Sequence, residues 1–225
     1  MTRTTNARIA GFTYLMYIAL AFPAMFLFAK ATNVPGIAAK LASIARHAPD
    51  VRVVIVLELL ACFAAVVLAV ALYGVTRDED HELAVVALSC RVGEGVLNAI
   101  FILATLGLLW LATGGTGGDA PDAAAANALG AFLLKVRDWN TTISATFFAV
   151  GSTLLSYLLL RGRSVPVLLA WLGVIASALL VVCLPLQLAD VLRGPITLLM
   201  WIPVAAFELT LGPWLLIKGV KIKEK

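Results

Sequence analysis

The chain has 225 residues, of which 62% are hydrophobic and 13% are charged, with a formal net charge of +4. Soluble domains carry about 25% charged residues, so this composition indicates a membrane protein and excludes a soluble domain with a large core. The lysines and arginines lie mainly in loops and tails and form no basic face with a groove-reading element, which argues against nucleic-acid binding.

Six apolar segments are long enough to cross a hydrocarbon layer of about 30 Å. They cover residues 9–29, 53–75, 83–113, 139–160, 165–188 and 196–220. The sequence therefore predicts an all-α fold, a polytopic membrane bundle of six transmembrane helices in a single integral membrane domain over residues 1–225. The first segment ends in Ala29-Lys30-Ala31, which resembles a signal-peptide cleavage site. Because the segment is longer than the apolar part of most signal peptides, we interpret it as a retained helix.

The connection between the first two segments contains an amphipathic stretch. Ile37, Leu41 and Ile44 recur at helical spacing, and Pro35 is suited to a helix start. This pattern predicts a short amphipathic helix along the membrane interface. A short helix that covers the end of the bundle explains the pattern equally well.

Two further connections carry residues that could suggest a ligand site. His81 lies in an acidic run over residues 76–82, but no second metal ligand follows at a fixed spacing, so we interpret the run as a solvated turn. Residues 114–119 are glycine-rich but lack the Gly-Lys-Ser/Thr ending of a phosphate-binding loop, which favours a flexible connection. Asp119 or Asp122 is expected to cap the following helix. That helix is predicted to start outside the bilayer and enter it near Trp139.

The third segment has one polar stripe on an otherwise apolar helix. Arg91, Glu94 and Asn98 fall within about 60° of one another at 100° per residue. A charge at membrane depth usually faces the interior of the bundle and pairs with another polar group. We therefore expect Arg91 to pair with Glu94 or Glu208.

A wider set of polar residues is predicted to line a buried ligand-binding pocket. The set comprises Glu58, Arg91, Glu94, Asn98, Arg137, Asp138, Asn140 and Glu208. One interpretation is that this pocket binds or transports a small molecule or protons. The alternative is a structural or interaction subunit whose buried charges only hold helices together. A third is a carboxylate-dependent enzyme that modifies lipids.

Catalytic motifs are missing from the sequence. No apolar segment contains a histidine, Ser152 is not in a G-x-S-x-G motif, and Lys218 is too near the end of its segment for a retinal linkage. Cys62, Cys90 and Cys183 are scattered in apolar segments and are interpreted as buried small residues. We assign no catalytic residue, metal or cofactor, and the lipid bilayer is the only partner that the sequence predicts besides the small-molecule or proton ligand. The oligomeric state is left open.

The distribution of lysine and arginine favours a cytoplasmic location for both termini, on the logic of the positive-inside rule. We expect the chain to reside in the cytoplasmic (inner) membrane of a bacterium.

Several short motifs recur in an order that resembles a known family. They are Ala7-Arg8-Ile9-Ala10-Gly11, Leu72-Tyr73, Arg91-x-x-Glu94, Gly151 to Arg161 with Pro166 after it, and Glu208-Leu209 followed by Trp214-Leu215-Leu216-Ile217-Lys218-Gly219-Val220. Together they resemble a bacterial family of six-helix integral membrane proteins known only as a domain of unknown function. The resemblance implies a fold and a membrane location, and it implies no activity.

Overall fold

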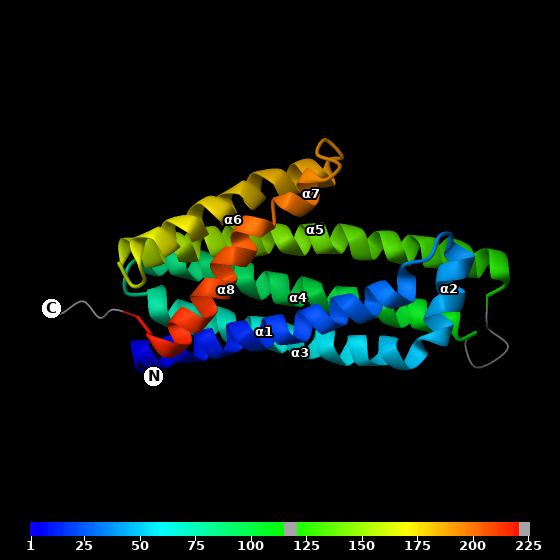
Figure 1. The fold of residues 1–225 in the computed structure, drawn as a ribbon, viewed down its shortest axis with the longest axis horizontal. Helices are drawn as coiled ribbons and strands as arrows, with labels where there is room; N and C mark the ends of the chain where they lie inside the picture. The colour runs from blue at the N-terminus through cyan, green and yellow to red at the C-terminus, as the bar shows by residue number, and fades with distance from the viewer. Residues whose placement is uncertain (115–120, 221–225) are drawn as a thin grey trace. The chain divides into compact units, whose positions relative to one another are not determined.

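The computed structural model describes residues 1–114 and 121–220, which form helices and contain no strand (Figure 1). The helices are α1 (Arg3–Thr32), α2 (Ile37–Arg46), α3 (Ala48–Thr76), α4 (His81–Ala112), α5 (Ala123–Arg161), α6 (Val167–Leu188), α7 (Ile196–Leu199) and α8 (Ile202–Ile217). In these ranges six segments are long and apolar enough to cross a membrane, with α7 and α8 together forming the last. This confirms the predicted all-α, six-span membrane protein. The expected flexible connection at 114–119 lies outside the described residues except for Gly114, and so does Asp119.

The fourth span is part of one continuous helix, as expected. Helix α5 has 39 residues and begins well before Trp139, because its first turns are rich in alanine, the best helix former. Asp122 caps it, since its Oδ1 accepts a hydrogen bond of 2.8 Å from the backbone N–H of Ala125. This confirms Asp122 as one of the two predicted capping residues.

The sixth span is interrupted, which the apolar pattern did not indicate. Helix α7 ends at Leu199 and α8 begins at Ile202, with Pro203 in the first turn of α8. A proline is well accommodated there, because the first N–H groups of a helix have no partner within it. Helix α8 is therefore an independent helix of 16 residues that carries Glu208.

The helices contribute to two compact units, which are described separately. Unit 1 comprises Met1–Tyr17, Phe63–Val96 and Thr142–Lys225, and unit 2 comprises Ile18–Cys62 and Leu97–Thr141. The single membrane domain expected from the sequence stays a prediction.

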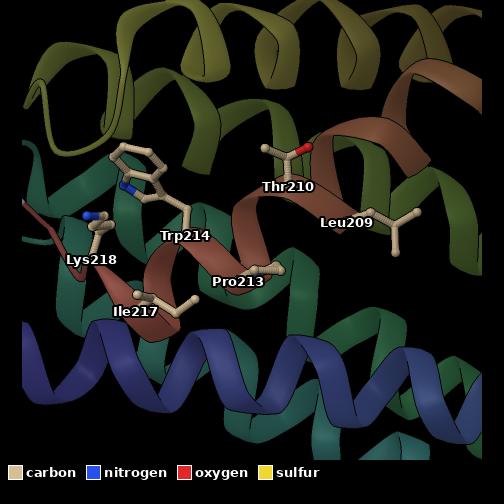
Figure 2. Close-up of a pocket in the computed structure, with 6 residues that line it drawn as sticks. All are labelled: Leu209, Thr210, Pro213, Trp214, Ile217 and Lys218. Carbon is tan, nitrogen blue, oxygen red and sulfur yellow. The ribbon is translucent and has the colours of Figure 1, made fainter.

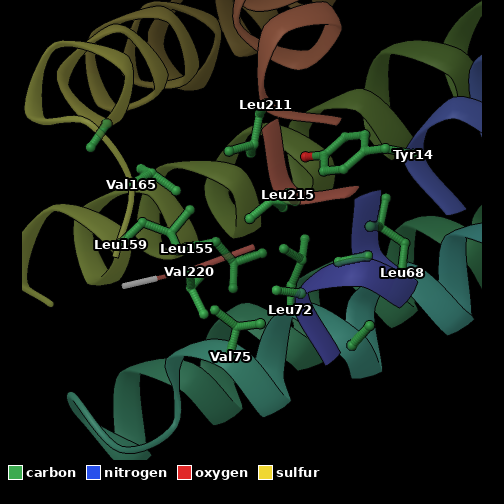
Figure 3. Close-up of a cluster of buried hydrophobic side chains, with 14 of the residues drawn as sticks. Tyr14, Leu68, Leu72, Val75, Leu155, Leu159, Val165, Leu211, Leu215 and Val220 are labelled. Atoms are coloured by element: carbon green, nitrogen blue, oxygen red, sulfur yellow. The ribbon is translucent and has the colours of Figure 1, made fainter. Parts of the chain in front are cut away.

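Unit 1 has an apolar core to which α1, α3, α4, α5, α6 and α8 contribute buried residues. Figure 3 shows side chains from α1, α3, α5 and α8 converging on this core, and the α5–α6 connection adds Val165. Buried members include Leu68, Leu72, Leu159 and Leu211. The helices α6 and α8 also contact each other in this unit. The core thus fixes the segments of α1 and α4 that carry the buried Tyr14, Arg91 and Glu94, and the segment of α8 that carries the half-buried Glu208.

Helices α1 and α8 approach each other very closely within unit 1. A Cβ atom placed on Gly11 would lie 2.3 Å from the backbone nitrogen of Leu216 and 2.6 Å from the carbonyl oxygen of Gly212. Only glycine at position 11 allows this backbone contact, because small residues let two helix backbones approach closely.

The end of unit 1 that contains the chain's N-terminus is held together by Arg3. Its Nε donates a hydrogen bond of 2.8 Å to the carbonyl oxygen of Val75, and its Nη2 contacts Glu79 Oε1 at 3.1 Å and Ser164 Oγ at 2.9 Å. Arg161 pairs with Asp80 at 2.9 Å in the same group of connections. Arg3 therefore joins α1 to the end of α3 and to the connections that follow α3 and α5.

Unit 2 contains the predicted amphipathic helix, α2. Leu41 and Ile44 are buried in a cluster with Val51 and Leu108, and a Cβ on Gly130 of α5 would lie 3.3 Å from a methyl group of Leu41. The apolar face of α2 thus packs on the other helices of this unit. Its position along a membrane interface stays a prediction.

Candidate functional site

The deepest charged pair of unit 1 lies on α4. Arg91 and Glu94 are separated by three positions and therefore share one face of the helix. Arg91 Nη1 lies 2.8 Å from Glu94 Oε2, and their side chains are 1% and 5% exposed. The expected pairing of Arg91 with a glutamate is thus confirmed, and the partner in direct contact is Glu94. At 1.5 Å per residue Arg91 is roughly 15 Å from the start of α4.

A second carboxylate and a tyrosine hydroxyl join this pair from two other helices. Tyr14 of α1 is 3% exposed, and its hydroxyl forms a hydrogen bond with the carboxylate of Glu208 on α8. The charge of Glu208 interacts with those of both Arg91 and Glu94. Arg91 also interacts with Tyr17, one turn after Tyr14. We call Tyr14, Arg91, Glu94 and Glu208 the unit 1 cluster.

Helix α5 holds the arginine of this cluster from the other side. The guanidinium carbon of Arg91 lies 4.6 Å from the ring centre of Phe148, a cation–π contact. Gly151 leaves room for the aliphatic part of Arg91, since a Cβ there would lie 2.9 Å from its Cγ. Ser144 Oγ donates a hydrogen bond of 3.4 Å to the backbone carbonyl of Glu94. Phe148 and Gly151 thus pack against the Arg91 side chain, and Ser144 links α5 to the backbone of α4.

Several polar atoms of the cluster remain unsatisfied. Within the described residues, Arg91 Nε, Arg91 Nη1 and Glu94 Oε2 are buried and have no hydrogen-bond partner. The 2.8 Å contact between Nη1 and Oε2 is therefore an ion pair without hydrogen-bond geometry. Buried unsatisfied polar groups are rare in native proteins, and each calls for an explanation, such as strain, a catalytic role, or a bound water or ion.

A second buried polar group lies in unit 2 and is centred on Arg137 of α5. Its Nη2 lies 3.2 Å from Glu58 Oε1 of α3, and its Nη1 donates a hydrogen bond to Thr105 Oγ1 of α4. The guanidinium carbon lies 3.7 Å from the ring centre of Phe28 and 3.5 Å from that of Phe101. We call these five residues the unit 2 cluster.

The remaining residues predicted for the pocket also belong to unit 2. Asn140 is 7% exposed and donates a hydrogen bond of 2.9 Å from Nδ2 to the carbonyl oxygen of Leu97. Asn98 is half-buried and Asp138 is exposed. The structure thus brings Arg91, Glu94 and Glu208 together in unit 1 and pairs Glu58 with Arg137 in unit 2.

Sequence reasoning missed four important partners. Tyr14 lies in an apolar helix, and Phe28, Phe101 and Thr105 look like ordinary residues of a transmembrane segment. The one available signal was Tyr14, because a buried tyrosine hydroxyl usually needs a hydrogen-bond partner. Nothing in the sequence linked Phe28 and Phe101 to an arginine more than thirty residues away.

A comparison with protein families identifies the family of this chain. The model of a family described as "Domain of unknown function (DUF4386)" matches residues 9–219, nearly the whole chain. No curated protein and no solved structure matches the chain. The matched range includes every residue of the two clusters.

Proposed function

The chain belongs to the DUF4386 family, a family of unknown function, and within it we propose that this multi-pass membrane protein binds a proton at Glu208 of the unit 1 cluster. The observation that carries the proposal is the ratio of charged groups in that cluster. Two carboxylates, Glu94 and Glu208, share one guanidinium, that of Arg91.

The charge balance favours a bound proton. An unneutralised charge is costly inside a membrane and is avoided by pairing or by protonation. Arg91 neutralises Glu94, which it contacts at 2.8 Å, and leaves one negative charge on the cluster if Glu208 is ionised. A proton on Glu208 removes this charge. The Tyr14 hydroxyl forms a hydrogen bond with the same carboxylate and orients the Glu208 side chain.

The location of the cluster suits proton exchange. Arg91 is ten residues from the start of α4 and Glu208 ten residues before Lys218. Each is therefore roughly 15 Å from a helix end, about half of a 30 Å hydrocarbon layer. The unsatisfied atoms of Arg91 and Glu94 provide donors and an acceptor for the water that proton exchange requires.

We also propose a bacterial cytoplasmic membrane as the location, with both termini in the cytoplasm. Arg3, Arg8, Arg77 and Arg161 lie at the helix ends of unit 1 nearest the N-terminus, and a cytoplasmic surface is enriched in such residues. Reporter fusions to each terminus test this orientation.

The unit 2 cluster supports the second interpretation, a structural one. It contains one carboxylate and one guanidinium, which pair directly, and two aromatic rings enclose the cation. With its charges balanced, this cluster is best explained as a bond that joins α3, α4 and α5.

Infrared spectroscopy of the protein in lipid at neutral pH tests the proton proposal. An ordinary glutamate has a pKa of about 4.3 and is ionised at this pH, so a protonated carboxyl gives a separate carbonyl band that shifts in deuterated water. We expect this band in the wild type and its loss in Glu208→Gln. Glu82→Gln, at an exposed acid in the first turn of α4, is the matched control and retains the band.

Two results contradict the proposal. A wild type without a protonated-carboxyl band rules out a bound proton at neutral pH. A band that persists in Glu208→Gln but disappears in Glu94→Gln shows that the proton is bound to Glu94, the carboxylate that contacts Arg91, and not to Glu208.

A further inference from the structure

The outer face of α8 carries a groove that the proton proposal does not use. It is lined by Leu209, Thr210, Pro213, Trp214, Ile217 and Lys218. Figure 2 shows these side chains along one stretch of the helix, as three pairs of neighbouring residues on successive turns. Thr210 and Pro213 contribute small side chains to this lining, and the other four residues contribute larger ones.

The groove has the polarity of an amphiphile. Its lining is apolar from Leu209 to Ile217, with Thr210 as the exception, and Lys218 places one cation at its end. Leu209, Ile217 and Lys218 are exposed. In a membrane-spanning helix these side chains face lipid, and a lysine at the end of the span extends its ammonium group to the headgroup level.

Two hydrogen-bond donors lie together at the charged end. Figure 2 shows the indole nitrogen of Trp214 on the side of the ring nearer Lys218. An indole N–H is a donor only, and an ammonium group offers three more donors. Such a pair suits the oxygens of a phosphate group, and no acidic residue lines the groove to oppose it.

The length of the groove suits one acyl chain. Leu209 and Lys218 are nine positions apart, roughly 14 Å along the helix at 1.5 Å per residue. One leaflet of the hydrocarbon layer is about 15 Å thick, half of 30 Å. In the sequence, lysines at 221, 223 and 225 follow Lys218, and basic clusters next to a membrane span attract anionic lipids.

We propose that this groove is a binding site for an anionic phospholipid. The phosphate contacts Lys218 and Trp214, and one acyl chain lies along Leu209, Pro213 and Ile217. The site is separate from the proton-binding cluster and does not depend on it, because its lining residues are outside that cluster.

Quenching of tryptophan fluorescence by brominated lipids tests this site. The full chain is placed in bilayers of phosphatidylcholine with increasing brominated phosphatidylglycerol or, separately, brominated phosphatidylcholine. The quenching of Trp214 itself is obtained as the difference between the fluorescence quenched in the wild type and that quenched in Trp214→Phe. We expect brominated phosphatidylglycerol to quench Trp214 half-maximally at an about fivefold lower fraction of the lipid than brominated phosphatidylcholine. A preference of this size is what one lysine near the membrane surface provides.

Four variants separate the contribution of the lipid headgroup from that of the acyl chain. Lys218→Gln removes the preference for phosphatidylglycerol, whereas Lys135→Gln, the same change at an exposed lysine of α5, retains it. Thr210→Phe fills the groove and lowers quenching of Trp214 by both lipids, while Thr210→Val keeps the shape of the side chain and leaves it unchanged. Thr210 is exposed, so neither substitution disturbs the core.

Other outcomes overturn the proposal. Equal quenching by the two brominated lipids identifies ordinary boundary lipid rather than an anionic site. An unchanged preference in Lys218→Gln removes the headgroup contact. Displacement of the brominated phosphatidylglycerol by inorganic phosphate identifies a free anion, not a lipid, as the ligand.

Discussion

Gly151 of α5 makes room for the side chain of Arg91 on α4: a Cβ at position 151 would lie 2.9 Å from Arg91 Cγ and 3.0 Å from its Cδ. The buried arginine is therefore positioned by the absence of a side chain as well as by Glu94 and Phe148. This relationship makes the packing of α5 a determinant of the unit 1 cluster.

Replacing this glycine is expected to destabilise the protein through Arg91. Gly151→Ala introduces an overlap with a side chain that is 1% exposed and has no room to move. We expect a loss of about 1–3 kcal/mol in the free energy of unfolding, typical of overpacked cores. Reversible unfolding in mixed micelles measures it. If the overlap with the aliphatic part of Arg91 causes this loss of stability, Gly151→Ala costs less in an Arg91→Ala background than in the wild type. An equal loss in the two backgrounds refutes this explanation.

The charged pair of unit 2 predicts an asymmetry between single and double substitutions. Glu58→Leu leaves Arg137, whose side chain is 6% exposed, without its carboxylate, and removal of one partner of a buried pair costs about 3–5 kcal/mol. Glu58→Leu with Arg137→Met removes both charges and is expected to lose much less. The same unfolding assay checks this. A double variant as unstable as the single one would mean that the ion pair itself, rather than the stranded cation, is important.

How far the sequence could predict these sites depended on the distance between partners along the chain. Arg91 and Glu94 are on one helix, three positions apart, so helical periodicity alone placed them together. Glu58 and Arg137 are on different helices, and hydropathy identifies spans without identifying which spans are neighbours. Arg137 was therefore expected only as one of the residues that line a common pocket, and its pairing with Glu58 went unrecognised.

The same reasoning explains the successes and gaps in the fold. Six long apolar segments follow from composition, because lipid has no polar groups to compensate an irregular backbone. The division between α7 and α8 occurs inside one apolar run, where Pro203 was the only signal. Arg3 contacts Val75, Glu79 and Ser164, and nothing in the sequence linked it to these distant residues.

These contacts give a prediction for the end of unit 1. Arg3→Gln removes two hydrogen bonds and an ion pair from a side chain that is only 16% exposed. Hydrogen bonds to charged groups contribute about 1.5–3 kcal/mol when partly buried, so we expect a loss of this order. Arg8→Gln, at an exposed arginine of the same helix, is the control and should change stability little. Equal effects of both variants would point to net charge instead of the contacts of Arg3.

The crossing of α1 and α8 gives the sharpest steric prediction, because the atoms that oppose a new side chain belong to the backbone. In Gly11→Ala the added Cβ would lie 2.3 Å from the nitrogen of Leu216, so the two helices must separate. We expect a loss of about 3 kcal/mol or more, at the upper end of the range for overpacking. Gly93→Ala is the matched control, since its Cβ would meet only the ring of Phe147 at 3.0 Å, and that ring is 42% exposed and free to turn.

Tyr14 is one turn beyond Gly11 and Glu208 one turn before Gly212, so separation of the helices also pulls apart the hydroxyl and the carboxylate. Gly11→Ala should therefore alter the protonated-carboxyl band of Glu208 as well as stability, whereas Gly93→Ala leaves both unchanged. A Gly11→Ala protein with wild-type stability would show that α1 and α8 do not make this contact in the membrane.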